Sequence, residues 1–410
     1  MTLWLALVSA AATAWFAVLI GRHRFWWPGP WLAEGDRPPA RDAQWPTIVA
    51  IVPARDEAAV LSTTLPTLAA QDYPGHLEIV VVDDESSDGT FEEARRLLAE
   101  TLNSNQAGRR SWRVLRGEPT APGWAGKVWA LEQGRRAARD ATWLWLTDAD
   151  ITHHPATLRY LVSKAETDRR DLVSVMAVLR ARTLWEKLIV PAFVYFFALL
   201  YPFRRVASGK VGAAAGGCIL VKVAFLEKIG GLASIATATI DDLALAGAVR
   251  KAGGRCWLGF HEGVRSVREY SRLSALWSMI SRSAFTQLRH SWLALAGVVT
   301  ALALMFAVPP AALTAGAING DSRVAVIGAL TWGSSSASLV PLLRRVFGLS
   351  FGWSVLLPVV GLLYAAMTVS SAWSATSGRP IPWRGRPVSV ATRHIKKPRL
   401  IVPSSRDRLR

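Results

Sequence analysis

Long apolar segments stand at both ends of the chain, and a region of mixed polarity separates them. Leu3 to Ile20 carries no charge and has about the length that a bilayer core requires. Three further apolar stretches follow, at Trp292 to Ile318, Val324 to Leu343 and Phe351 to Trp373. This pattern predicts an N-terminal membrane anchor over residues 1–24 and a bundle of membrane helices over residues 291–376.

The middle region, residues 46–290, alternates short apolar runs with helix-like stretches. The apolar runs predict strands at Thr47–Val52, Leu77–Val82, 112–115 and Trp143–Leu146, with Pro53 ending the first, and the stretches between them predict helices near 57–71, 90–102 and 127–139. Alternation of this kind is typical of an α/β domain with a mostly parallel sheet and crossover helices. Since ligands bind beyond the carboxyl ends of strands in such sheets, we expect those strand ends to share one crevice.

Basic residues set the expected orientation in the membrane. Arg22, His23 and Arg24 follow the first apolar segment directly, which places its C-terminal end in the cytoplasm. In a cleaved signal peptide the charge would come before the apolar run, so an uncleaved anchor is expected. We therefore predict a multi-pass protein of the inner (cytoplasmic) membrane with its middle domain in the cytoplasm.

The number of C-terminal spans stays open between two and three. If all three stretches cross the membrane, the basic C-terminus emerges on the outer side, against the positive-inside rule. The segment 324–343 is rich in Ser and Gly and is the weakest candidate, although Arg344 and Arg345 at its end fit a cytoplasmic loop. A shorter apolar run, Val190–Phe203, predicts either an interfacial helix or a core helix.

Composition supports a soluble domain joined to membrane helices. The 410 residues are 51% hydrophobic and 19% charged, with a net charge of +18. The tail, residues 377–410, is strongly basic, because residues 379–410 hold ten Lys or Arg against the single acid Asp407. A tail of this kind favours anionic lipid headgroups and not nucleic acid as its partner. Cys218 and Cys256 stand far apart, which excludes a Cys-x-x-Cys zinc site and a disulfide framework.

Paired acids follow the predicted strands. Asp148 and Asp150 come directly after the run that ends at Leu146, and their hard oxygen ligands suit Mg²⁺ or Mn²⁺. Taken alone, the pair is better explained by a solvated turn, and only the neighbouring motifs favour the metal site. Asp241 and Asp242 form another pair, which as an isolated feature also fits acids at a helix N-terminus.

Three motifs in order resemble those of inverting family 2 glycosyltransferases of GT-A fold. They are Pro53-Ala54-Arg55-Asp56-Glu57, then Val81-Val82-Asp83-Asp84-Glu85-Ser86-Ser87-Asp88-Gly89-Thr90, then Asp148-Ala149-Asp150. The terminal membrane segments are similar to those of the hopanoid-biosynthesis-associated branch, which also looks like ceramide glucosyltransferases. The resemblance implies a Rossmann-like GT-A domain over residues 46–290 that takes a sugar from a nucleotide-sugar donor, with a UDP-sugar expected.

The same resemblance implies roles for the motif residues at the donor. It places Ala54, Arg55 and Glu57 near the base and ribose, and Asp84 on the uracil or ribose. A carboxylate accepts hydrogen bonds from such groups, and leaving a buried acceptor unpaired is costly. Lys127 is similar to a lysine that these enzymes place beside the donor phosphates, with an ordinary exposed lysine at a helix start as the alternative.

The resemblance also implies metal-binding and catalytic roles for the two acidic pairs. Asp148 and Asp150 would hold Mg²⁺ or Mn²⁺ at the diphosphate, and Asp148 and Asp241 would also lie beside the donor. Asp242 matches the catalytic base, which takes the proton of the attacking hydroxyl while the metal stabilises the departing diphosphate. Asp241 replaces a longer Glu of the family.

Gln287 and Arg289 partly match the Gln-x-x-Arg-Trp motif of processive members. Arg289 stands two residues after Gln287 and Trp292 stands five after it, so the spacing differs and favours a single-transfer enzyme. Gln287, Arg289 and Arg282 are therefore candidate contacts for the diphosphate or the acceptor, or else simply residues that flank a membrane entry.

The predicted function is a membrane-bound, metal-dependent inverting glycosyltransferase. It would move one sugar from a nucleotide-sugar to a hydroxyl of a membrane lipid, with a hopanoid as the candidate acceptor. A processive polysaccharide synthase, a membrane nucleotidyltransferase of similar fold, and a non-enzymatic scaffold or transporter are the alternatives. Transport is disfavoured because the four apolar stretches contain no acid.

Overall fold

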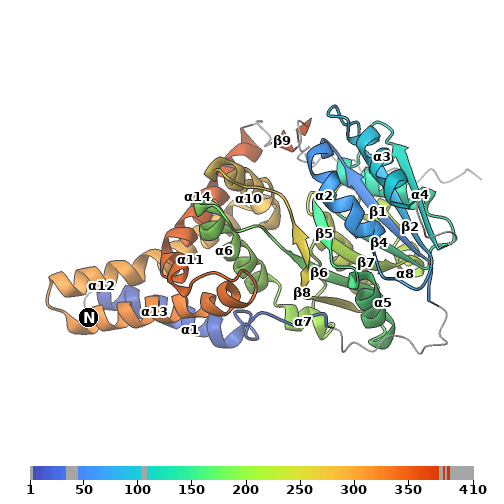
Figure 1. The fold of residues 1–410 in the computed structure, drawn as a ribbon. Coiled ribbons are helices and arrows are strands. Elements are labelled where there is room, and N and C mark those ends of the chain that lie inside the picture. The colour runs from blue at the N-terminus through green and yellow to red at the C-terminus, as the bar shows by residue number, and fades with distance from the viewer. Residues whose placement is uncertain (1–2, 34–44, 103–108, 378–381, 384–385, 388–410) are drawn as a thin grey trace, which may run out of the picture.

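The computed structural model describes residues 3–33, 45–102, 109–377, 382–383 and 386–387. Nearly all of the predicted basic tail, and with it the lipid contact expected there, lies outside the described residues. In the described part, a domain built on one sheet joins a set of helices formed by both ends of the chain (Figure 1).

Eight strands form the sheet of the middle domain, in the order β3-β2-β1-β4-β7-β6-β8-β5. They are β1 Ile48–Ala54, β2 Leu77–Asp83, β3 Arg110–Arg116, β4 Trp143–Thr147, β5 Ile151–His153, β6 Leu172–Val178, β7 Cys218–Lys222 and β8 Cys256–Ser266. Strands β3, β2, β1 and β4 pair in parallel, as do β6 and β8, whereas β7 and β5 run antiparallel to their neighbours. The predicted mostly parallel α/β sheet is confirmed.

The strands read as nearly continuous apolar runs because helices cover both faces of the sheet. Along β1, Val49 and Ile51 point into one core, and Ile48, Ala50 and Val52 into the other. The first core is closed by α4 Gly126–Ala137, α8 Val223–Lys228 and α9 Asp241–Lys251. The second is closed by α2 Ala58–Ala69, α3 Thr90–Leu102 and α5 Thr157–Thr167.

One strand boundary was predicted wrongly. Pro53 was expected to end the first strand, but β1 continues to Ala54, with Pro53 opposite Val82 of β2. The missing N–H of proline does not break the pairing here, because the Ala54 carbonyl accepts a hydrogen bond from the Asp84 N–H at 2.7 Å. The chain therefore stays extended until it reaches the edge where the acidic residues lie.

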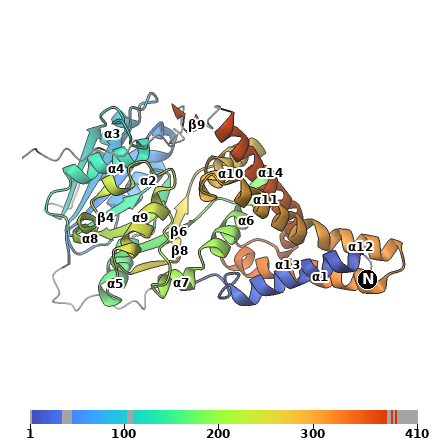
Figure 2. The ribbon, with the colours of Figure 1, turned by 180° about the vertical axis from the view of Figure 1, so that it is seen from behind.

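Among the described residues, four helical segments are long and apolar enough to cross a membrane. They are α1 Leu3–Gly21; the stretch Trp292–Ile318, made of α11 Trp292–Leu302, a π-helical turn at Ala303–Ala307 and α12 Val308–Ile318; α13 Ser322–Arg345; and the stretch of a short 3-10 turn at Phe351–Leu356 with α14 Leu357–Thr376. Figures 1 and 2 show α1, α12 and α13 running together away from the sheet domain. In both views α11 and α14 lie between that group and the domain, at a steep angle to it.

The bend within Trp292–Ile318 has a chemical cause. Pro309 has no N–H, so the carbonyl of Met305 loses its partner four residues along the helix. The indole N–H of Trp15, in α1, donates to that carbonyl at 2.7 Å. A π-helical turn stands at the same place, and Phe306 within it packs against Gly361, where a Cβ atom would lie 2.3 Å from the ring. The carbonyl that the bend leaves without a helical partner is thus hydrogen-bonded by a neighbouring helix. A backbone that is buried or faces lipid requires such a partner.

The serine-rich segment forms a continuous helix. In α13 the hydroxyls of Ser335 and Ser338 donate to carbonyls of their own helix, at 2.9 and 2.6 Å. Ser338 also shares a 2.5 Å hydrogen bond with the hydroxyl of Tyr195. The hydroxyls of Ser335 and Ser338 are thus satisfied, whereas that of Ser336 is buried without a partner in the ranges that the structure describes. The segment predicted to be the weakest span has the length of a spanning helix.

Some helices formed by the middle region of the sequence lie between the sheet and the membrane segments. They are α6 Leu184–Leu200, α7 Phe203–Ala207 and α10 Leu273–Gln287. Thr183 and Glu186 form a capping box that begins α6, several residues before the predicted start. Because Ile189 and Val190 are fully buried against α10 and α14, the core-helix alternative is confirmed for this face of α6.

Candidate active site

The carboxyl ends of three adjacent strands meet at one edge of the sheet. Strand β1 ends at Ala54, β2 at Asp83 and β4 at Thr147, and these strands lie side by side in the order β2-β1-β4. Asp84 and Asp148 directly follow two of these ends. The sheet therefore brings the motifs that resemble those of a glycosyltransferase to one edge.

Lys127 joins acids from two different elements. Its Nζ atom, at the start of α4, lies 2.8 Å from Asp148 Oδ1 and 3.2 Å from Asp241 Oδ2. Beside them, Asp242 accepts hydrogen bonds from the Gly216 N–H at 2.8 Å and the Leu243 N–H at 2.7 Å. We call Lys127, Asp148, Asp241 and Asp242 the Lys127 cluster.

The Lys127 cluster lines a cavity of about 310 Å³, open mouth included, with Gly216 also in its wall. The remainder of the cavity wall is mostly apolar and comes from Leu131, Leu146, Thr147, Ile219, Leu232, Ile235 and Leu245. An apolar wall with a few convergent charged groups is typical of a ligand site.

The electrostatics of the Lys127 cluster are unbalanced. Burial and the neighbouring Asp241 raise the pKa of Asp242 to about 7, although Lys127 and two backbone N–H groups oppose the shift. Burial also raises the pKa of Asp148, with Lys127 opposing and Asp150 adding to the shift. Burial works against the charge of Lys127, but Asp148 and Asp241 outweigh it and raise the pKa of the amine. Three carboxylates share one ammonium, so the site favours an additional cation.

Gly216 is a site residue that the sequence analysis missed. A Cβ atom here would lie 3.3 Å from Lys127 Nζ and 3.4 Å from Asp242 Oδ2. The glycine therefore leaves room between the charged groups of the cluster. Its only sequence signal is the Gly216-Gly217 pair just before a strand.

Asp150 lies in a second charged group, built around Arg268. Arg268 Nε lies 3.0 Å from Asp150 Oδ2, and its Nη2 lies 2.5 Å from Glu57 Oε1. The hydroxyl of Ser266, the last residue of β8, also donates to Asp150 Oδ2 at 2.8 Å. We call Glu57, Asp150 and Arg268 the Arg268 cluster; the sequence analysis predicted its acids and missed its base.

The residues predicted to bind the nucleotide lie in the loops after β1 and β2, and hydrogen bonds join the two loops. Arg55 donates to the Asp84 carbonyl at 2.5 Å, and the Glu57 N–H donates to the Thr90 hydroxyl at 2.9 Å. Asp84 itself is 2% exposed. Asp88 accepts from the Ala58 and Thr90 N–H groups, each at 3.0 Å, so this acid of the motif has a structural role in holding the two loops together.

Residues from α10 reach the same edge. The side-chain amide of Gln287 donates a short hydrogen bond to the Tyr201 hydroxyl, which follows α6. Burial raises the pKa of Tyr201, while the hydrogen bond from Gln287 lowers it; the charge of Asp242 adds to the shift and that of Arg289 opposes it. Burial lowers the pKa of Arg282, while Tyr270, Asp148 and Asp241 partly compensate its charge. Arg282 thus interacts electrostatically with the acids of this edge, whereas Arg289 interacts with Tyr201 and Gln287 contacts it.

The residues present fit a divalent cation that a diphosphate helps to bind. Within the described ranges, no group of three or more His, Cys, Asp or Glu side chains could hold a metal by itself. Mg²⁺ commonly takes one or two carboxylates and completes its shell with phosphate oxygens and water. Asp148 and Asp150 would supply those two, since the side-chain contacts of Asp150 fall on Oδ2. The excess negative charge around Asp148 fits such an ion.

Residues 49–230 match the family model described as Glycosyl transferase family 2. No functionally curated protein matches the sequence.

Among solved structures, the chain is similar to a mannosyltransferase from Pyrobaculum calidifontis, solved with GDP-Man and Mn²⁺. The two are 22% identical, the match covers 91% of this chain and 98% of that one, and the TM-score is 0.53. The S. aureus protein TarS with UDP-GlcNAc is 14% identical, with 82% of this chain and 93% of that one covered and a TM-score of 0.38. The glucosyl-3-phosphoglycerate synthase of Mycobacterium tuberculosis with Mn²⁺, UDP-Glc and phosphoglyceric acid is 20% identical, with 60% and 79% covered and a TM-score of 0.38. The first likeness shows the fold.

Proposed function

We propose that the chain is a membrane-bound, metal-dependent inverting glycosyltransferase, because residues 49–230 match the family model described as Glycosyl transferase family 2. It transfers one sugar from a nucleotide-sugar to a hydroxyl group of a membrane lipid. The observation that carries the proposal is the Lys127 cluster, in which Asp148 after β4 and the acids that begin α9 converge beside a single lysine in an apolar-walled cavity.

Asp242 is proposed as the catalytic base. Two backbone N–H groups, of Gly216 and Leu243, hold its carboxylate in place. With its pKa raised to about 7, the carboxylate suits proton transfer near neutral pH. The acceptor oxygen forms a bond to the anomeric carbon as the bond from that carbon to the diphosphate oxygen breaks. The acceptor proton passes to Asp242, and displacement from the opposite face inverts the anomeric centre.

The remaining charged residues are proposed to hold the donor. Asp148 and Asp150 would hold Mg²⁺ or Mn²⁺, which when bound stabilises the negative charge of the departing diphosphate. Lys127, in the cavity wall, supplies further positive charge, and Arg282 interacts electrostatically with Asp148 and Asp241. Ala54, Arg55, Glu57 and Asp84 are proposed to receive the nucleotide, with a UDP-sugar as the expected donor.

The membrane side of the site supports a lipid acceptor. Tyr201 and Gln287, near Asp242, stand at the C-terminal ends of α6 and α10. Both helices pack against α14, in an apolar segment long enough to span a membrane. A lipid hydroxyl that enters between these helices would reach the base without crossing the sheet domain. Hopanoids are the lipid class suggested by the sequence resemblance.

We further propose that α1, α13 and the stretch Trp292–Ile318, whose C-terminal part is α12, span the membrane while α14 lies near its cytoplasmic surface. The C-terminal ends of α1 and α13 stand together, since the guanidinium of Arg345 lies 4.3 Å from the ring centre of Trp27. Both ends carry basic residues, as cytoplasmic ends do. The steep angle of α14 to this group supports its lying along the surface (Figure 2). The basic tail would then stay in the cytoplasm.

The experiment uses membranes that contain the full chain, incubated with radiolabelled UDP- and GDP-sugars and Mg²⁺ or Mn²⁺. We expect one labelled lipid that carries a single sugar, and no labelled lipid with Asp242→Asn. A labelled polymer would instead support the processive synthase. Release of pyrophosphate in place of nucleoside diphosphate would support the nucleotidyltransferase. Absence of transfer from every donor to any lipid would contradict the proposal.

A further inference from the structure

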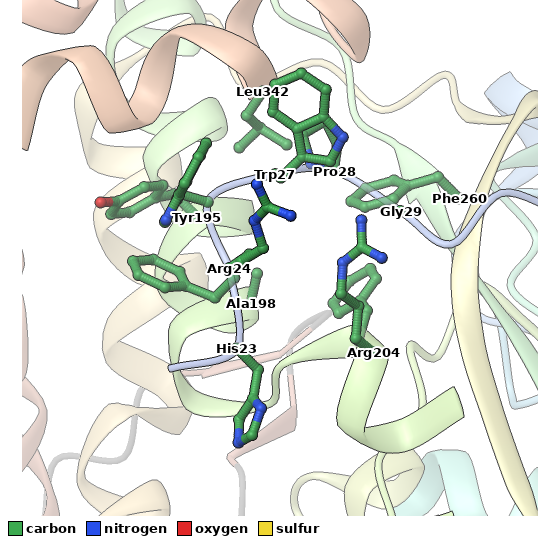
Figure 3. Close-up of a pocket in the computed structure, with 13 residues that line it drawn as sticks. His23, Arg24, Trp27, Pro28, Gly29, Tyr195, Ala198, Arg204, Phe260 and Leu342 are labelled. Atoms are coloured by element: carbon green, nitrogen blue, oxygen red, sulfur yellow. The ribbon is translucent and has the colours of Figure 1, made fainter. Parts of the chain in front are cut away.

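A second pocket lies where α1 leaves the membrane segment, apart from the Lys127 cluster. It has a volume of about 350 Å³, open mouth included, and its wall joins the loop after α1 to α6, α7, β8 and α13 (Figure 3). The residues that line it are His23, Arg24, Phe25, Trp26, Trp27, Pro28, Gly29, Tyr195, Ala198, Phe203, Arg204, Phe260 and Leu342. None of the residues in this described wall is acidic.

Two arginines face this pocket from different elements. Figure 3 shows Arg24 and Arg204 rising from opposite sides, with both guanidinium groups directed toward the space below Trp27 and Phe260. Within the described part of the chain, neither arginine has a carboxylate partner. Paired arginine forks of this kind match the oxygen atoms of a phosphate group.

The loop that presents Arg24 has an uncommon backbone conformation and is held by contacts with α6. His23 and Arg24 both adopt left-handed backbone angles, with φ of 54° and 53°, an uncommon conformation outside glycine. Arg22 anchors the loop by donating to the Leu199 carbonyl at 2.8 Å. Phe25 contacts Tyr195, with ring centres 5.0 Å apart. Backbone conformations of this kind persist where surrounding contacts enforce them, often at ligand sites.

The position of the pocket along the membrane helices favours a lipid as the source of the phosphate. It stands at the C-terminal end of α1 and beside Leu342, in the last turn of α13 before Arg344 and Arg345. Trp26 and Trp27 at its rim are the residue type that gathers at the headgroup level. Basic pockets between membrane helices at this level hold the headgroups of anionic lipids. We infer that this pocket binds the phosphate of an anionic phospholipid, whose acyl chains lie along α1 and α13.

The pocket is coupled to the sheet domain through β8. Phe260 in its wall donates from its N–H to the Pro30 carbonyl at 2.9 Å, and its own carbonyl accepts from the Leu32 N–H at 2.8 Å. The same strand ends at Ser266, which holds Asp150. A bound headgroup would therefore fix the domain against the membrane surface. This inference does not depend on the proposed transfer reaction.

Native mass spectrometry of the full chain in detergent, titrated with phosphatidylglycerol, tests the inference. The double variant Arg24→Gln/Arg204→Gln is expected to bind the tightest phosphatidylglycerol about tenfold more weakly than the wild type, because it loses two charged hydrogen-bond donors. Arg139→Gln/Lys251→Gln is the matched control. It removes two exposed basic residues of the sheet domain and is expected to bind like the wild type.

Separate arms distinguish the ligand sources. Inorganic phosphate at the same concentration is expected not to displace the lipid; displacement would show a free-phosphate site and overturn the inference. Equal phosphatidylglycerol binding by the wild type and the arginine variant would overturn it as well. If the double variant does not fold, as judged by thermal unfolding, Arg24→Lys/Arg204→Lys replaces it. That variant keeps the charge but loses the fork geometry, and weaker binding is again expected.

Discussion

The Lys127 cluster and the Arg268 cluster stand at the same edge of the sheet but differ in charge balance. In the first, Asp148, Asp241 and Asp242 share one lysine, and burial raises the pKa values of Asp148 and Asp242. In the second, the guanidinium of Arg268 spans two acids and is held by both. The comparison teaches that an unbalanced acidic cluster suits chemistry and cation binding, whereas a bridged one fixes loops in place. Asp150 belongs to the bridged group and neighbours the unbalanced one.

The largest expected effect comes from Asp242→Asn. If Asp242 is the base, the variant loses transfer by about a thousandfold or more in kcat, while donor binding is retained because the side-chain shape is kept. Transfer assays and equilibrium binding of the nucleotide-sugar measure the two effects. The exposed Asp140→Asn is the control and is expected to react like the wild type. Wild-type turnover in Asp242→Asn would remove the Lys127 cluster from the chemistry.

The Arg268 cluster is expected to show its effect in stability. Arg268→Gln leaves Glu57 and Asp150 mostly buried without their cation, which lowers the free energy of unfolding by about 3 kcal/mol. Arg116→Gln breaks the ion pair with Glu92, in which both side chains are 67% exposed, and should change the stability far less, because water screens such a pair. Thermal unfolding in detergent measures both. Equal stability of the two variants would show that the Arg268 bridge does not hold the loops.

The strand ends and their acids could be predicted because each is written locally in the sequence. Asp84 and Asp148 directly follow apolar runs, and parallel strands bring such ends together. The Arg268 bridge could not be predicted, since Arg268 and Glu57 stand 211 positions apart and meet only through the order of β8 and its neighbours. Nor could the sequence reveal the contact between Trp15 and the Met305 carbonyl, which needs two helices from opposite ends of the chain.

The pH dependence follows from the raised pKa of Asp242. The base must be ionised to accept a proton, so kcat/KM should fall about tenfold for each unit of pH below the pKa of about 7, and level off above it. Lys127 opposes the shift, so Lys127→Gln should move the midpoint to higher pH. A pH profile of transfer at saturating metal measures both. A midpoint near the ordinary value of an aspartate, unmoved in Lys127→Gln, would contradict the account of this cluster.

The smallest expected effect concerns the two neighbouring glycines before β7, Gly216 and Gly217. Gly216→Ala puts a methyl group 3.3 Å from Lys127 Nζ, and we expect kcat/KM to fall about fivefold as the charged groups shift. Gly217→Ala meets Ile151 at 3.2 Å, an equally tight contact in an apolar setting, and serves as the control. Equal effects of the two variants on kcat/KM would mean that Gly216 does not shape the site.

The dependence of lipid labelling on a divalent ion tests the central claim most directly. Membranes containing the wild type are treated with chelator and then given Mg²⁺ or Mn²⁺ before the radiolabelled nucleotide-sugar is added. We predict that chelation abolishes the singly glycosylated lipid, that either ion or both restore it, and that Asp148→Asn needs more ion for the same rate. Labelling that persists unchanged under chelation would contradict the claim that these acids share a divalent ion with the donor diphosphate.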